Sequence, residues 1–299
     1  MAPLKYSEIQ QVVQAAFSAL SRNGLEACLF GSVAMATYGM EHRVPKDVDV
    51  IVLNSTPGQT DEDIKSLIVL SDPNFFLVDS RAAGAKHRIL WYSLGDPATP
   101  SKLLGNATEA SKESVRRARK VPATSQQLPG PSSASSTPQK ACKVDILIPG
   151  LLDIPSVPIS ELHLDFSSNF VSYLPSPPIV SAISGTGPTT RVSPIPSVPF
   201  ITLLLLKLRA WSDHSLLTAN AKLHERIPQD EEDIDELLRI GLNLGPQGVV
   251  RIGTGQNDGE ESAKWMLGGF ATWRDARRTV ASYIRKWPRS ATGWTAAGF

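Results

Sequence analysis

The chain has 299 residues, of which 41% are hydrophobic, and a formal net charge of +1. This length allows one large domain or two ordinary ones, and the balanced charge excludes a whole-protein basic field of the kind that attracts nucleic acids. Two cysteines are too few for a disulfide framework, and the longest apolar run, FITLLLLKL, is too short to span a membrane. We therefore expect an intracellular protein without a membrane partner, cytoplasmic by default and with a nuclear location left open.

The first half of the chain alternates between helix and strand patterns. Apolar residues at helical spacing predict a helix at 7–23, which ends at an Asn-Gly pair. Short runs rich in valine, isoleucine and aromatic residues predict strands. The strands are expected at 26–30, 47–53, 74–80, 87–94 and 142–149, with helices at 32–40 and 60–72 between them. The strands at 74–80 and 87–94 are expected to be adjacent or to form a hairpin.

The second half has a different character. Residues 151–199 are rich in Pro, Ser and Ile, with one strand expected within 161–174. Helices are expected at 199–214 and 230–242, with one or two more within 260–287. The order of elements predicts an α/β domain at 1–150, followed by a mainly helical domain at 151–299 that completes a cleft with the first.

An insertion at 96–141 separates the last two strands of the first half. It holds six prolines and eight serines and no aromatic residue. Such a stretch cannot bury enough apolar surface to offset the entropy lost on ordering, so we expect it to be disordered. Its basic run KESVRRARK indicates either a solvated charge run or a nuclear signal or RNA contact.

Two carboxylates interrupt an aliphatic strand at Asp47 and Asp49. Side chains in a strand alternate between its faces, so these two lie on the same side, about 6–7 Å apart. Two like charges beside valine and isoleucine are unfavourable unless a cation neutralises them. Oxygen ligands in this arrangement suit Mg²⁺ or Mn²⁺. A solvent-facing strand gives the same spacing, and that interpretation stays open for the pair alone.

Two further features point to the same chemistry. Asp145 is a single acid in the aliphatic strand VDILI, and three converging carboxylates are what a two-metal site for phosphoryl transfer requires. Upstream, Gly31 and Ser32 stand between a strand and a helix, where free backbone N–H groups attract anions and a glycine lets a phosphate approach. Together they predict metal-assisted transfer from a nucleoside triphosphate.

The stretch FGSVAMATYGMEHRVPKDVDVIV resembles the nucleotidyltransferase-fold superfamily, whose motif is a hydrophobic-Gly-Ser turn followed by an acid-hydrophobic-acid strand. The match rests on Gly31, Ser32, Asp47 and Asp49, with Asp145 in the position of the third carboxylate. The chain is most similar to the group of AbiEii-type toxins and related uncharacterised fungal proteins. The resemblance implies an α/β (α+β) nucleotidyltransferase fold with a small mixed sheet, followed by an α-helical C-terminal half.

That group also carries an Arg before the acid pair, a Lys in a Leu-Lys-Leu helix and an Asp-x-x-Asp element. Arg43, Lys207 and Asp233 occupy these positions, whereas Gln229 stands where the group usually has a basic residue. Each match has a structural alternative. Lys207 would then be a surface residue, Arg43 the partner of a strand-end carboxylate and Asp233 a helix-surface acid.

The resemblance implies a role for each matched residue. The ligands of Mg²⁺ (or Mn²⁺) on the triphosphate would be the carboxylates Asp47, Asp49 and Asp145, which are also the catalytic residues. The nucleotide would be bound by Gly31, Ser32, Arg43, Lys207 and Asp233. The acceptor of the nucleotidyl group is left open between a protein, an RNA end and a small molecule. The alternative function is a nucleotide-binding or scaffold protein that has the same fold and no catalysis.

Overall fold

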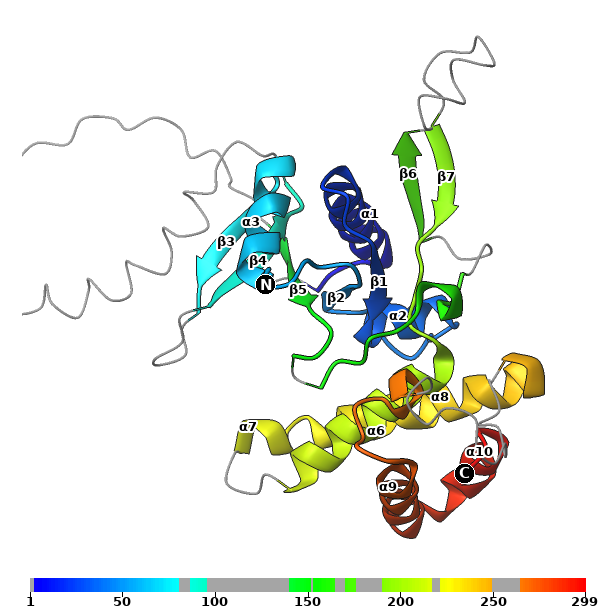
Figure 1. Cartoon of the computed structure of the whole chain (residues 1–299). Coiled ribbons are helices and arrows are strands. Elements are labelled where there is room, and N and C mark those ends of the chain that lie inside the picture. The colour runs from blue at the N-terminus through cyan, green and yellow to red at the C-terminus, as the bar shows by residue number, and fades with distance from the viewer. Residues whose placement is uncertain are drawn as a thin grey trace, which may run out of the picture.

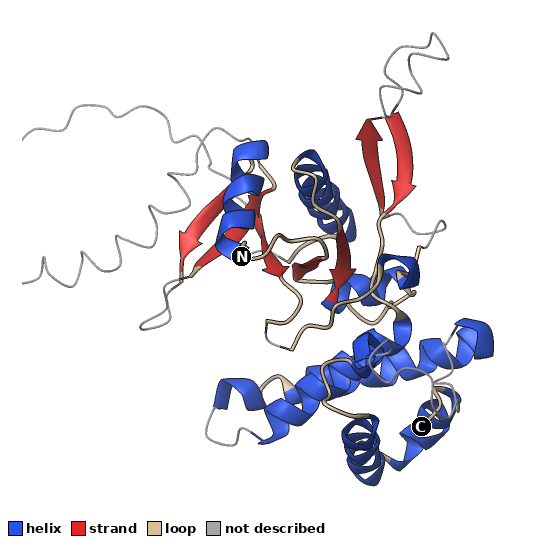
Figure 2. Ribbon diagram, viewed as in Figure 1, coloured by secondary structure: helices blue, strands red, loops and turns tan. Residues whose placement is uncertain are grey.

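The structure is a computed structural model that describes residues 3–80, 87–95, 140–151, 153–164, 170–175, 190–216, 221–248 and 264–299. A five-stranded mixed sheet lies at the centre of the first half (Figures 1 and 2). Its strands are β1 (Ala27–Phe30), β2 (Asp47–Val52), β3 (Phe75–Asp79), β4 (Arg88–Ser93) and β5 (Ala141–Leu147), in the order β1-β2-β5-β4-β3. β2 and β5 are parallel, and the other neighbours in this sheet are antiparallel. The expected hairpin of the third and fourth strands is confirmed.

Three helices accompany this sheet: α1 (Tyr6–Arg22), α2 (Gly31–Thr37) and α3 (Asp61–Ser71). α1 forms because its apolar residues recur every three or four positions and bury one side of the helix. α3 begins at a capping box, in which the hydroxyl of Thr60 accepts a hydrogen bond from the amide of Asp63. α1 contacts both α3 and the sheet, whereas α2 contacts β1, β2 and the helical half. α2 therefore joins the two halves of the fold.

The second half begins with a short 3-10 helix, η1 (Ile159–Glu161), and a hairpin of β6 (Val171–Pro175) and β7 (Thr190–Pro194). Its helices gather on one side of the first half (Figure 1). They are α6 (Phe200–Leu216), α7 (Ala221–His224), α8 (Ile227–Gly248), η2 (Lys264–Leu267), α9 (Trp273–Lys286), η3 (Pro288–Ser290) and α10 (Ala291–Ala296). α6 packs against α8 and α9, and α10 packs against α8. α6 is apolar on most of its surface because it lies at the centre of this group.

The segment that precedes α6 runs along the outer edge of β1. The amide of Leu29 donates to the carbonyl of Pro196 at 2.7 Å, and the amide of Val198 donates to the carbonyl of Leu29 at 3.0 Å. This segment therefore extends the hydrogen bonding of the sheet beyond β1.

The second half differs from expectation in several places. In the described part of the expected range 161–174, the strand covers only residues 171–174. It extends one residue beyond that range, to residue 175. Its partner β7 was not expected, because its Pro- and Ser-containing sequence has no alternation of apolar residues. The mainly helical half therefore includes a two-stranded sheet. α8 is longer than predicted, and η3 and α10 lie beyond the last expected helix.

The expected C-terminal boundary of the insertion, residue 141, lies two residues too far along the chain. Ala141 is the first residue of β5, and Lys140 forms an ion pair with Glu8 of α1, at 2.9 Å between Nζ and Oε1. The rest of the insertion, with its basic run, lies outside the described residues. Among the helices that the structure describes, none has the length and apolar character needed to cross a membrane.

Candidate active site

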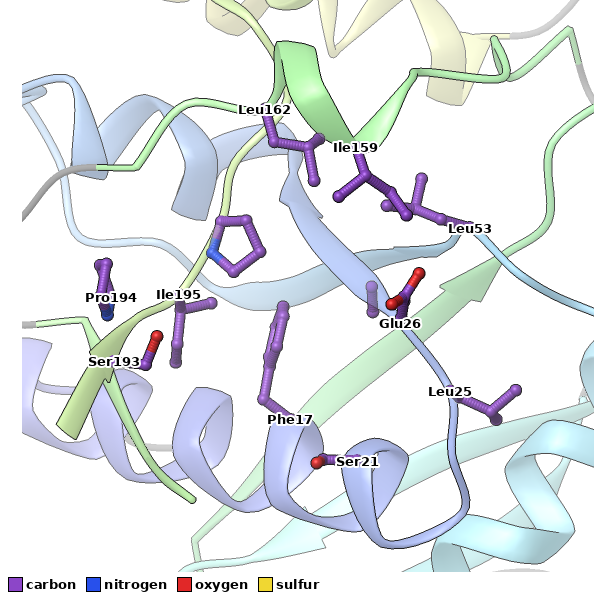
Figure 3. Close-up of a pocket in the computed structure, with 12 residues that line it drawn as sticks. Phe17, Ser21, Leu25, Glu26, Leu53, Ile159, Leu162, Ser193, Pro194 and Ile195 are labelled. Carbon is purple, nitrogen blue, oxygen red and sulfur yellow. The ribbon is translucent and has the colours of Figure 1, made fainter. Parts of the chain in front are cut away.

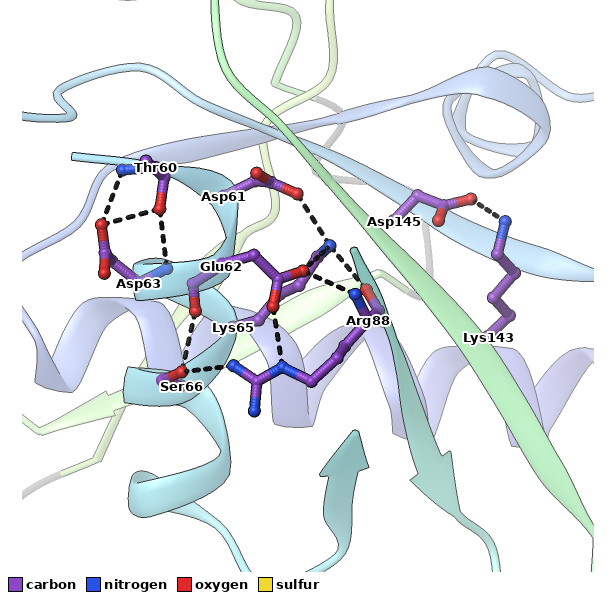
Figure 4. A network of polar contacts seen from close by, with 9 residues as sticks. All are labelled: Thr60, Asp61, Glu62, Asp63, Lys65, Ser66, Arg88, Lys143 and Asp145. Carbon is purple, nitrogen blue, oxygen red and sulfur yellow. Dashed lines mark hydrogen bonds and ion pairs between the residues drawn. The ribbon is translucent and has the colours of Figure 1, made fainter. Parts of the chain in front are cut away.

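The strand register brings four charged side chains onto one face of the sheet. Asp49 lies opposite Asp145 in the parallel pair of β2 and β5, and Asp47 lies opposite Lys143. Residues in register share a face, and so do residues two apart in a strand. The ammonium of Lys143 contacts Asp145, at 2.5 Å between Nζ and Oδ2 (Figure 4). The prediction that the three carboxylates lie on adjacent strands therefore agrees with the register, and the structure adds a lysine.

The predictions from sequence did not include Lys143. The signal is present, since Lys143 precedes Asp145 by two residues and a period of two places both on one face.

Gly31 fits against the middle carboxylate. Its φ is +62°, in the left-handed region that favours glycine. A Cβ atom at this position would overlap Oδ2 of Asp49. Burial, together with the charges of Asp47 and Asp145, raises the pKa of Asp49 to about 7. The two neighbouring carboxylates therefore act on Asp49 more strongly than the two nearby lysines, Lys143 and Lys207.

Ser32 follows in the first turn of α2. Its hydroxyl is buried and has no hydrogen-bond partner within the described residues. A buried polar atom of this kind is rare unless a ligand, water or ion satisfies it. The close approach of Asp49 to Gly31, the orphaned hydroxyl of Ser32 and the clustered carboxylates fit a metal-bound polyphosphate. No group of three or more His, Cys, Asp or Glu side chains in the described ranges is arranged to hold a metal ion unaided.

A second cluster surrounds Asp233 of α8, whose side chain is only 1% exposed. Arg43 donates two hydrogen bonds to its carboxylate, at 2.9 and 2.8 Å, and Lys207 of α6 donates one at 2.8 Å. Weaker contacts come from His42 at 3.2 Å and Gln229 at 3.3 Å. Asp233 is therefore not a helix-surface acid, and Arg43 pairs with a helix residue and not with a strand end.

The charges around Asp233 determine its protonation. Burial alone would raise the pKa of Asp233, but hydrogen bonds from Arg43 and the charge and hydrogen bond of Lys207 outweigh it and hold the pKa at about 2. The two clusters also influence each other. Lys207 lowers the pKa of Asp49, while Asp47 contributes to raising the pKa of Arg43. The structure thus joins the two sets of predicted residues through their charges.

A separate pocket of about 230 Å³ lies at the other ends of β1 and β2 (Figure 3). Its wall is largely apolar, from Phe17, Leu25, Leu53 and Leu162 among others, with Glu26 at the start of β1. It contains none of the predicted site residues. The candidate site therefore rests on the acid cluster and not on this cavity.

Replacing Asp49 with asparagine is expected to stabilise the protein at high pH. The folded pKa of about 7 exceeds that of an unfolded aspartate, near 3.9. Folding therefore binds a proton between these values, so stability falls as the pH rises from about 4 to 7. In the absence of divalent metal, the variant should be more stable than wild type by at least about 1.4 kcal/mol at pH 8, the equivalent of one pKa unit.

Urea unfolding from pH 4 to pH 8 measures this difference. The gain should disappear near pH 4, and the exposed Asp79→Asn variant on β3 serves as the control. A gain that stays constant with pH would mean that ionisation of Asp49 is not its source.

These elements form a nucleotidyltransferase-like fold: a mixed sheet with the Gly-Ser turn after its first strand, followed by a helical half. A solved structure similar to this chain is that of an antigenic nucleotidyltransferase-like protein from Paracoccidioides brasiliensis. The two share 13% sequence identity with a TM-score of 0.53, over 99% of this chain and 96% of the other. The sequence matches no family model and no curated protein. At this identity the likeness concerns the fold alone, and it confirms the expected fold class.

Proposed function

We propose that this protein is a metal-dependent nucleotidyltransferase, which moves a nucleoside monophosphate from a nucleoside triphosphate to an acceptor hydroxyl. The observation that carries the proposal is the position of Asp49. Its carboxylate packs closely against Gly31 and lies beside Asp47 and Asp145. Burial and these two charges raise the pKa of Asp49 to about 7. A bound cation would strongly stabilise the charged form of a carboxylate that is buried beside other carboxylates. The finer likeness to the AbiEii-type and fungal group is part of this proposal.

The residues around the turn would bind the metal and the phosphates. Asp47 and Asp49 would hold Mg²⁺ or Mn²⁺, with Asp145 available as a further ligand once Lys143 releases it. When bound, the metal would neutralise charge on the triphosphate. The buried hydroxyl of Ser32 would donate to a phosphate oxygen, and Gly31 allows the carboxylate of Asp49 to lie against the first residue of α2.

The second cluster would supply positive charge from both halves, with Lys207 on α6 and Arg43 shortly before β2. Lys207 and Arg43 are each less than a fifth exposed, and both are fixed by Asp233. Fixed cations stabilise developing phosphate charge better than mobile ones, because they need no reorganisation. Asp233 is buried among its donors, so we propose that it positions these two cations and does not itself contact the nucleotide.

The transfer step would form one bond and break another. The acceptor oxygen would bond to the α-phosphorus, and the bond from that phosphorus to the pyrophosphate oxygen would break. Asp145 would accept the hydroxyl proton once Lys143 has released its carboxylate. The acceptor class remains a protein, an RNA end or a small molecule. Incubation of the protein with each labelled nucleotide and a cell lysate would show which acceptor gains label.

Calorimetry of nucleotide binding tests the proposal. ATP, GTP, CTP and UTP are titrated with Mg²⁺ and with EDTA, and at least one should bind only with the metal. Asp47→Asn should weaken that binding at least tenfold, or about 1.4 kcal/mol. The matched control is Asp79→Asn, which removes an exposed carboxylate from the edge strand β3. Equal binding by wild type and Asp47→Asn would overturn the assignment.

A nucleotide-binding module without catalysis is the second candidate. It is favoured by the ion pair between Lys143 and Asp145, which occupies the third carboxylate, and by the lack of a complete metal-ligand group among the described residues. Metal-dependent binding with no label transferred to any acceptor would support it. Transfer by wild type that is lost in Asp145→Ala would exclude it.

A further inference from the structure

One face of α6 makes two neighbouring polar contacts with α8. The ammonium of Lys207 donates to Asp233, at 2.8 Å between Nζ and Oδ2. Two turns later on α6, Nδ1 of His214 lies 2.6 Å from Oδ2 of Asp230. A spacing of about two helical turns keeps Lys207 and His214 on one face of α6, and a spacing of about one turn does the same for the two acids of α8. Both contacts therefore belong to the interface between these packed helices (Figure 1).

Asp230 is a buried carboxylate with spare capacity to accept hydrogen bonds. It is 7% exposed, and within the described part of the chain His214 is the side chain that hydrogen-bonds to it. A carboxylate can only accept, so the Nδ1–H group of His214 is the donor. Burial raises the pKa of Asp230, whereas the hydrogen bond from His214 and the charge of Lys207 lower it. The contact with His214 therefore stabilises the charged form of Asp230.

Lys207 lies within the influence of two carboxylates but hydrogen-bonds to one of them. Its charge lowers the pKa of both Asp230 and Asp233, while its ammonium donates to Asp233. Asp233 is already crowded, because Arg43 donates two hydrogen bonds to the same carboxylate. Without His214, Asp230 would be a buried charge without a partner, which is costly. A lysine ammonium on its flexible stem could move to Asp230 and reduce that cost.

The position of Lys207 matters because its charge also reaches the acid cluster, where it lowers the pKa of Asp49. The charges that act most on Asp230 come from His214, Lys207 and Asp233, and not from the acid cluster. Asp230 thus lies farther from that cluster than Lys207 does. A shift of the ammonium from Asp233 towards Asp230 would therefore move positive charge away from Asp49.

We propose that His214 is a positioning residue for Lys207. By donating to Asp230, it keeps this carboxylate from drawing the ammonium of Lys207 off Asp233, so that Lys207 stays near the acid cluster where the triphosphate would bind. The inference rests on the proposed function for the identity of the ligand. The competition between Asp230 and Asp233 for one ammonium exists with or without a nucleotide. In the structural alternative, His214 only fastens α6 to the first turn of α8.

Calorimetry with Mg²⁺ and inorganic tripolyphosphate, the part that all nucleoside triphosphates share, tests the proposal. His214→Ala should bind at least about fivefold more weakly than wild type. His214→Asn should bind within about twofold of wild type, because its amide can take the place of Nδ1 and still donate to Asp230. His214→Ala combined with Asp230→Asn should also recover binding, since the competing charge is gone.

Two further variants complete the binding series. In a Lys207→Met background, adding His214→Ala should not weaken binding further, because no ammonium is left to be drawn away. The matched control is His224→Ala, which removes an exposed histidine at the end of α7 and should bind like wild type. Circular dichroism checks that each variant is folded. His214→Leu, which keeps an apolar side chain, replaces His214→Ala if the latter does not fold.

Urea unfolding without metal or phosphate tests the same point independently of binding. A double-mutant cycle with Lys207→Met and Asp230→Asn measures the coupling between these two side chains. In the His214→Ala background this coupling should be at least about twice its value in the wild-type background, because the ammonium has moved to Asp230.

Two kinds of result would overturn the proposal. The first is a coupling between Lys207 and Asp230 that does not change when His214 is removed. The second is binding by His214→Asn, or by the double variant with Asp230→Asn, that is as weak as binding by His214→Ala. If wild type bound no tripolyphosphate while the coupling rose as expected, His214 would still control Lys207, and the proposed nucleotidyl transfer would be wrong.

Discussion

Replacing Asp233 with alanine is expected to lower the free energy of unfolding by about 3–5 kcal/mol, the usual consequence of removing one partner from a buried ion pair. Asp233 is buried and binds both Arg43 and Lys207. Without it, two largely buried cations would lie close together with no carboxylate bound to them. The same change should weaken nucleotide binding, because these cations would lose their fixed positions. Urea unfolding at pH 7 measures the stability change.

The matched control lies one residue earlier on the same helix. Glu232 is exposed and has no ion-pair partner among the described residues, so Glu232→Ala should change stability by less than about 0.5 kcal/mol. The pH dependence gives a second check. The pKa of Asp233 is lowered to about 2, so its stabilising effect is complete above the unfolded value near 3.9 and is lost as the pH falls towards 2. If Asp233→Ala and Glu232→Ala were equally stable at pH 7, the central role of Asp233 would be wrong.

Gly31→Ala is the second change with a large expected effect. The backbone of Gly31 has a φ of +62°, which is unfavourable for alanine by about 1–2 kcal/mol. The new Cβ would also overlap the carboxylate of Asp49, so either the turn or Asp49 must move. We expect metal-dependent nucleotide binding to fall at least tenfold. Calorimetry and urea unfolding on the same sample measure both effects.

Gly24 provides the control for backbone strain. Its φ is +69°, close to that of Gly31, but a Cβ there would meet no atom within 4 Å. Gly24→Ala should therefore lose stability without losing nucleotide binding. Adding Asp49→Ala to Gly31→Ala should recover part of the stability, because the overlapping carboxylate is gone. If the two glycine variants lost equal stability and both kept binding, close contact between Gly31 and Asp49 would be excluded.

The sequence predicts the elements whose local pattern is strong. Alternation defines β2, and the position of Gly31 between a strand and a helix indicates a turn before any coordinates are known. The Asp233 cluster could not be predicted in the same way, because its members come from three segments far apart in the chain, at 42–43, 207 and 229–233. The local pattern at 230–242 shows an acidic helix start, but only packing against α6 decides that two of those acids, Asp230 and Asp233, are buried.

Two other differences have specific causes. Lys143 could have been found from its spacing to Asp145, but its position opposite Asp47 depends on strand register, which a single sequence does not give. β7 was missed because a hairpin strand with Pro and Ser lacks the alternation that marks a half-buried strand, whereas most of β6 lies within the strand expected at 161–174.

The hydrogen bonds between Leu29 and the segment at 196–198 cover an outer edge of the sheet. β1 is the last strand on its side of the sheet, and an open outer strand offers free amide and carbonyl groups to any other extended chain. Here the amide and carbonyl of Leu29 are both satisfied by residues from the helical half. The helical half thus covers this edge of the sheet, and it also supplies the cation Lys207. A loss of this cover would leave an open sheet edge beside the Gly-Ser turn.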